Sequence, residues 1–159
     1  MGVAGCGKSA VGRLMADALS LPLIEGDDFH SASNIRKMQR GIALTDADRA
    51  DWLQALGGEL ARHPGGVVLT CSALKAAYRD SLRSATSRLH FVHLVITVAE
   101  SLSRVSQRPG HFYPASLVAS QFAALQDPAS ELAVLTLAAD APLEELARGA
   151  VAWLKGFRW

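Results

Sequence analysis

MGVAGCGKS, at residues 1–9, contains the pattern G-x-x-x-x-G-K-[ST], with Gly2, Gly7, Lys8 and Ser9 at its fixed positions. This pattern is typical of a loop that binds nucleotide phosphates and lies between a buried β-strand and a helix. Its glycines let backbone N–H groups point at phosphate oxygens, and the following helix adds the positive end of its dipole. The stretch therefore predicts an α/β fold with a nucleoside triphosphate site.

Two side chains of this loop have distinct expected roles. Lys8 would reach the β- and γ-phosphates and so take part in catalysis, and Ser9 would bind Mg²⁺. The pattern alone does not distinguish a kinase from an ATPase or a GTPase. The nucleotide-binding residues predicted from the loop are Gly2, Gly5, Cys6, Gly7, Lys8, Ser9 and Ala10.

Downstream of the loop, short apolar runs alternate with helical segments. Strands are expected at 22–25, 66–71, 89–96 and 132–138. Helices are expected at 8–19, 33–39, 46–63, 74–85, 98–107, 115–125 and 142–155, with Ser33, Thr45 and Ser72 as N-caps. This alternation predicts one domain over 1–159, built as a parallel sheet with helices on both faces.

Composition narrows the possible partners and the compartment. The 159 residues carry a formal net charge of +1 and are 50% hydrophobic. Without a basic arm or a long apolar run, neither nucleic acid nor a membrane is an expected partner. The spacing of Cys6 and Cys71 indicates neither a metal site nor a disulfide framework, so a reduced, cytoplasmic location is expected.

An acidic segment, EGDDFH, follows the strand expected at 22–25, where a parallel sheet opens onto its ligands. Asp27 could accept the proton of an attacking hydroxyl or bind Mg²⁺, whereas the side chain of Asp28 should point the other way. The alternative is an ordinary acidic turn. His30 could bond a substrate hydroxyl or lie exposed in the loop.

Two groups of basic residues could serve the same site. Lys75, Arg79 and Arg83 are spaced four apart, which predicts either an anion site or a solvated helix face. Arg104 and Arg108 precede Pro-Gly, and we expect them to form a lid around 104–114 that stabilises the transferred phosphoryl group and excludes water. The alternative is a salt-bridged surface helix.

Taken together, these segments resemble the gluconokinases, small P-loop kinases related to the shikimate and adenylate kinases. The resemblance extends over nearly the whole chain, and its most specific block is GDDFHSASNIRKMQRGIALTDADRADWL. Shikimate kinases share the phosphate loop and the strand-end aspartate but lack this block. The other blocks that carry the resemblance are MGVAGCGKSAVG, CSALKAAYRDSLR, RPGHFYPASLVASQFAALQDP and DAPLEEL.

The resemblance implies transfer of a phosphoryl group from ATP, with Mg²⁺, to the 6-hydroxyl of D-gluconate. It implies Asp27 as the base, Arg104 and Arg108 as lid arginines, the loop 139–142 with Pro142 against adenine, and a homodimer. Another small-metabolite kinase, such as a shikimate-type kinase, or an inactive nucleotide-binding remnant stays an alternative. The implied contacts to gluconate are His30, Lys37, Arg49, Lys75 and Arg79.

The resemblance also implies a three-layer sandwich whose parallel sheet has the strand order 2-3-1-4-5. This chain has four predicted strands, and the central first strand is absent before the phosphate loop. Such a strand would bury about four large side chains, worth roughly 6–12 kcal/mol, against a whole-domain stability of about 5–15 kcal/mol. We therefore expect that the natural product begins upstream, and that a chain beginning at Met1 has low stability and poor activity.

Overall fold

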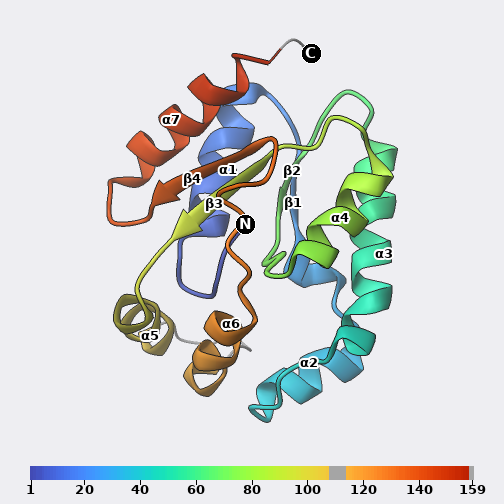
Figure 1. Cartoon of the computed structure of the whole chain (residues 1–159), viewed down its shortest axis with the longest axis vertical. Coiled ribbons are helices and arrows are strands. Elements are labelled where there is room, and N and C mark those ends of the chain that lie inside the picture. Colours follow the sequence, from blue (N-terminus) through green and yellow to red (C-terminus); the bar gives the residue numbers. More distant parts are fainter. Residues whose placement is uncertain (108–113, 158–159) are drawn as a thin grey trace.

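The computed structural model describes residues 1–107 and 114–157. In this part of the chain, four strands alternate with helices at the predicted places (Figure 1). The elements are α1 (Lys8–Leu19), β1 (Leu23–Glu25), η1 (Gly26–Phe29), α2 (Ala32–Gln39), α3 (Asp46–Arg62), β2 (Val68–Thr70), α4 (Ala76–Ala85), β3 (Phe91–Val95), α5 (Val98–Ser106), η2 (Ala115–Leu117), α6 (Val118–Ala124), β4 (Val134–Ala138) and α7 (Leu143–Leu154).

The strands form two parallel pairs. β1 pairs with β2, so that Leu23 lies opposite Val68, and β3 pairs with β4, so that Phe91 lies opposite Val134. Within the described residues, β2 and β3 do not pair with each other. The predicted α/β class with parallel strands is confirmed, and the two observed pairs are the outer pairs of the expected strand order 2-3-1-4-5.

Helices cover both faces of the strands, because alternate strand residues point to opposite sides. Val68 packs on the hydrophobic cluster that includes α1 and α7, whereas its neighbour Leu69 packs on the cluster of α3 and α4. Figure 1 shows α1 and α7 together on one side and α3 and α4 together on the other. The predicted three-layer sandwich is therefore present.

The first residues of the chain lie between the two strand pairs. The amino group of Met1 donates to the Val92 carbonyl at 2.5 Å, and the Leu94 N–H donates to the Met1 carbonyl at 3.0 Å. On the other side, the Gly2 N–H donates to the Ser72 carbonyl at 3.2 Å. Met1 and Gly2 thus occupy the position of a strand between β2 and β3.

A largely apolar cavity of about 610 Å³ continues from Met1 between β2 and β3. Its lining includes Val68, Thr70, Phe91 and Val92, which belong to the two strands that flank it. Burial lowers the pKa of the Met1 amino group, because charge is costly away from water. The space between β2 and β3 beyond Met1 is therefore a groove that no strand of the described residues fills.

Of the three predicted N-caps, one agrees with the structure and two differ. Thr45 caps α3 as predicted, in a capping box with Asp48. Ser31 caps α2 in place of Ser33, because its hydroxyl accepts from the Asn34 N–H at 3.2 Å. Ser72 does not cap α4: the left-handed backbone of Ala73, with φ of 43°, delays the helix until Ala76.

No helix in the described ranges is both long enough and apolar enough to cross a membrane.

Candidate active site

The phosphate loop curls into a cradle in front of α1. Gly5 and Gly7 have φ values of 77° and 93°, in the left-handed region where a side chain would cause strain. Gly7 is the N-cap of α1 and provides no side chain to satisfy the first N–H groups of the helix. These N–H groups remain available to an anion, as a phosphate site requires.

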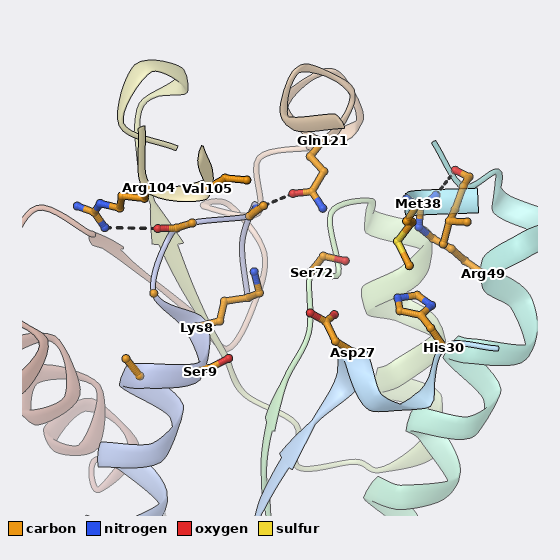
Figure 2. Close-up of a pocket in the computed structure, with 15 residues that line it drawn as sticks. Lys8, Ser9, Asp27, His30, Met38, Arg49, Ser72, Arg104, Val105 and Gln121 are labelled. Carbon is orange, nitrogen blue, oxygen red and sulfur yellow. Dashed lines mark hydrogen bonds between the residues drawn. The ribbon is translucent and has the colours of Figure 1, made fainter. Parts of the chain in front are cut away.

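A cavity of about 280 Å³ lies in front of this cradle (Figure 2). It brings together residues from the loop, from the end of β1, from α3 and from α5. One site therefore joins the predicted nucleotide end to the predicted acceptor end. The predicted site residues that line it are Gly5, Gly7, Lys8, Ser9, Ala10, Asp27, His30, Arg49 and Arg104.

Several predicted residues lie outside this lining. Gly2 and Cys6 belong to the loop but face away: Cys6 is buried in the core, and a Cβ on Gly2 would lie 2.7 Å from the Leu94 carbonyl oxygen. Pro142 is the N-cap of α7. Arg108 and most of the predicted lid lie outside the described residues. Lys37, Lys75 and Arg79 have other partners.

Polar side chains at the start of α1 contact the phosphate loop and the end of β1. Lys8 Nζ donates to the Val3 carbonyl at 3.0 Å, so the ammonium is held over the loop. Ser9 Oγ donates to Glu25 Oε2 at 2.9 Å, and the Thr70 hydroxyl donates to the same oxygen. Glu25 is thus a second acidic residue at the strand end, which we did not predict although it directly precedes Gly26.

Asp27 lies in η1 and faces the cavity, whereas Asp28 is exposed, as the sequence indicated. Gly26 makes this turn possible, since a Cβ there would lie 2.5 Å from the Thr70 carbonyl oxygen. Trp52 Nε1 donates to the Gly26 carbonyl at 2.8 Å. A buried indole from α3 therefore fixes the backbone that carries Asp27.

His30 and Arg49 form the far side of the cavity. The His30 ring stacks on Trp52, with centroids 4.7 Å apart and planes 8° apart. Burial lowers the pKa of His30 and so favours the neutral ring, and the negative charge of Asp27 opposes this with a smaller effect. Arg49 donates to the Leu44 carbonyl and lies 5.7 Å from the centre of the Tyr78 ring.

Two of the predicted substrate lysines are paired with the first turn of α3. Lys37 Nζ lies 2.6 Å from Asp48 and lowers the pKa of that carboxyl to about 2. Lys75 Nζ lies 2.6 Å from Asp46, and this hydrogen bond lowers the Asp46 pKa. Neither lysine lines the cavity, so a direct contact to substrate would require each to leave its carboxylate.

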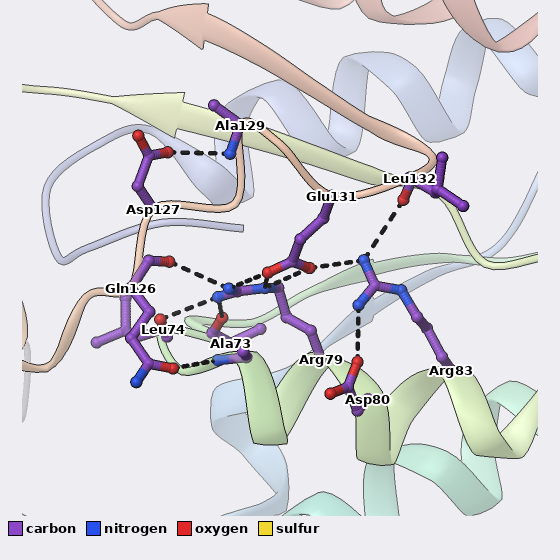
Figure 3. Close-up of polar contacts among 11 residues, drawn as sticks. Ala73, Leu74, Arg79, Asp80, Arg83, Gln126, Asp127, Ala129, Glu131 and Leu132 are labelled. Atoms are coloured by element: carbon purple, nitrogen blue, oxygen red, sulfur yellow. Dashed lines mark hydrogen bonds and ion pairs between the residues drawn. The ribbon is translucent and has the colours of Figure 1, made fainter.

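Arg79 is fully buried rather than on a solvated helix face (Figure 3). Its guanidinium donates to the carbonyls of Ala73, Leu74 and Gln126, and it pairs with Glu131. It therefore joins the loop after β2 to the loop before β4. In place of the predicted substrate contact, the structure gives Arg79 a network that uses all its nitrogens.

Two residues, one on α5 and one on α6, form hydrogen bonds to the phosphate loop. Arg104 donates to the Ala139 carbonyl at 3.0 Å and to the Gly5 carbonyl at 3.5 Å. Gln121 Oε1 accepts from the Ala4 N–H at 2.6 Å. Gln121 and Ser72 line the cavity but were not predicted as site residues, because no short pattern identifies a lone polar residue of a binding site.

The oxygen ligands that Mg²⁺ prefers gather at one end of this site. They are the Ser9 hydroxyl and the Glu25 and Asp27 carboxylates, from the loop and the end of β1. No group of three or more His, Cys, Asp or Glu residues within 1–107 and 114–157 could hold a metal ion. The donor set fits an ion held jointly by this end and by nucleotide phosphates.

Comparison with known proteins gives consistent matches. The family model described as shikimate kinase matches residues 4–141. The chain is 42% identical to a gluconokinase of Gluconobacter oxydans, covering 93% of this chain and 87% of the relative. It is 39% identical to the thermoresistant gluconokinase of Escherichia coli, covering 98% and 91%. The crystal structure of a gluconokinase from Sinorhizobium meliloti is similar, with 45% identity, a TM-score of 0.90, and coverage of 98% and 89%.

Proposed function

The chain belongs to the shikimate kinase family of P-loop kinases and, within it, to the gluconokinases, and we propose that it transfers the γ-phosphoryl group of ATP to D-gluconate. The product would be 6-phosphogluconate. The observation that carries this proposal is the single cavity that joins the phosphate cradle to Asp27, His30 and Arg49. A small hydroxylated anion needs a proton acceptor, hydrogen-bonding groups and a cation, and these three side chains supply them.

Each side chain has a role that follows from its position. Asp27, at the boundary between the two ends of the cavity, would take the proton of the attacking hydroxyl. The Arg49 guanidinium would bind the gluconate carboxylate, and neutral His30 would bond a hydroxyl. Lys8 and Arg104 would stabilise the charge that develops on the transferred group.

Mg²⁺ would be held by Ser9, with Glu25 and Asp27 nearby. The ion supplies neutralisation of phosphate charge when bound. Glu25 accepts from Ser9 Oγ and so orients the hydroxyl whose oxygen would face the ion. Lys37 and Lys75 flank the acceptor end, and their roles at gluconate depend on exchange of their present carboxylate partners.

An ADP-release assay with a panel of acceptors tests the proposal. Gluconate should support turnover, whereas shikimate and AMP should not. Turnover with shikimate or AMP but not gluconate would reject the substrate, and ATP binding without turnover of any acceptor would indicate an inactive nucleotide-binding protein. Asp27→Asn should lose transfer and keep ATP binding, and the matched variant Asp28→Asn should keep both because Asp28 is exposed.

A further inference from the structure

Gln121 connects α6 to the phosphate loop across 117 residues of sequence. Its Oε1 accepts from the Ala4 N–H at 2.6 Å. On the other side of the same residue, the Ala4 carbonyl accepts from Ser101 Oγ of α5 at 2.7 Å, and Ser101 is fully buried. The middle of the loop is therefore held from two helices, one through each of its backbone polar groups.

The hydrogen bond to Ala4 also fixes the orientation of the Gln121 amide. Because the backbone N–H is a donor, the oxygen of the carboxamide must face it, and Nε2 must face the other way. Figure 2 shows this nitrogen pointing into the cavity, toward the space between Lys8 and Ser72. Among the described residues, Nε2 has no hydrogen-bond partner.

The free donor stands where the two ends of the cavity meet. Lys8 belongs to the nucleotide end, whereas Ser72 lies on the side of Asp27 and His30 (Figure 2). An amide donor at this place is suited to a hydroxyl or carboxylate oxygen of a small acceptor. Its oxygen is already committed to the loop, so binding an acceptor at Nε2 would also hold Ala4 in place.

We propose that Gln121 is a positioning residue that binds the acceptor through Nε2 and the phosphate loop through Oε1. The amide then couples the acceptor to the nucleotide-binding loop, because an acceptor bound at Nε2 keeps Oε1 in its hydrogen bond with the Ala4 N–H. This inference rests on the proposed function only for the identity of the acceptor. The contact to Ala4 is independent of it.

Two substitutions separate the two halves of the amide. Gln121→Glu keeps an oxygen for the Ala4 N–H but removes the donor, and Gln121→Ala removes both. The matched control is Gln54→Glu, because Gln54 is exposed on α3, away from the cavity. The KM for gluconate tests the role of the Nε2 donor. The hydrogen-exchange rate of the Ala4 amide tests the contact of Oε1 with the loop.

For Gln121→Glu, we expect KM for gluconate to rise about tenfold, because losing one hydrogen bond to a ligand weakens binding by about this factor. KM for ATP should change severalfold less. A role limited to holding the loop would leave KM for gluconate at the wild-type value, and that result would overturn the proposal. Gln54→Glu should match wild type in both constants.

For Gln121→Ala, exchange at Ala4 should accelerate at least about tenfold, whereas Gln121→Glu should keep the slow rate. Unchanged exchange in Gln121→Ala would overturn the contact to the loop. If wild type turns over another acceptor but not gluconate, the proposed function fails and the same kinetic comparison is made with that acceptor. If no acceptor is turned over, the donor half is rejected and the exchange experiment decides the other half.

Discussion

Glu131→Ala removes the only carboxylate that pairs with the buried Arg79 in the described part of the chain. The side chain of Arg79 has no exposed surface, and that of Glu131 is 21% exposed. Removing one partner of a buried ion pair costs about 3–5 kcal/mol, because the remaining charge stays away from water. Three carbonyls still accept from Arg79, so we expect the lower end, about 3 kcal/mol.

In a domain of this size, about 3 kcal/mol corresponds to a fall in Tm of roughly 6–12 °C. Urea unfolding followed by circular dichroism measures the free energy, and calorimetry measures Tm. Asp80→Ala is the matched control: Asp80 pairs with Arg83 at 3.0 Å but is 70% exposed, so the loss should be about 0–1 kcal/mol.

A stability of Glu131→Ala equal to that of wild type would refute this reasoning, since it would mean that the guanidinium does not need its carboxylate. The pH dependence gives a second check. Hydrogen bonding from Arg79 lowers the pKa of Glu131 in the folded protein. The ionised Glu131 carboxylate therefore contributes its full stability above the pKa of the unfolded state. This stability is lost as the pH falls through the lower pKa of the folded state.

Three further outcomes are expected. Burial lowers the pKa of His93 to about 4, so unfolding free energy should fall as pH drops from about 6.5 to 4; His93→Leu should flatten this dependence in urea titrations at each pH. About five β-branched residues fused before Met1 should fill the groove and raise Tm in calorimetry, whereas a Gly-Ser segment of equal length should not. Arg104→Ala should lower kcat about 10²- to 10³-fold in steady-state assays, with ATP binding retained by titration.

Within the described residues, the sequence predicted every strand and most helix positions, because local signals define them. The apolar runs of β2 and β3, the capping box at Thr45 and the glycines of the phosphate loop each lie within a few residues. The sequence also predicted that Asp27 faces the cavity and that Asp28 points away from it, because neighbouring side chains at a strand end point in opposite directions.

The contacts that the sequence did not reveal depend on partners distant in the sequence. Arg79 looked like one of three basic residues on a helix face, but its partner Glu131 is 52 residues away. Lys75 and Gln121 likewise take their orientation from Asp46 and Ala4, at separations of 29 and 117 residues. Periodicity and short motifs contain no information on such contacts, so only the folded structure reveals them.

Product analysis tests the central claim most directly. The chain is incubated with ATP, Mg²⁺ and uniformly ¹³C-labelled gluconate, and the product is examined by ³¹P and ¹³C NMR. We expect one phosphate ester on the terminal hydroxymethyl carbon, formed in proportion to ADP, and no ester with Asp27→Asn. Release of ADP with inorganic phosphate alone, or an ester at another carbon, would contradict the account.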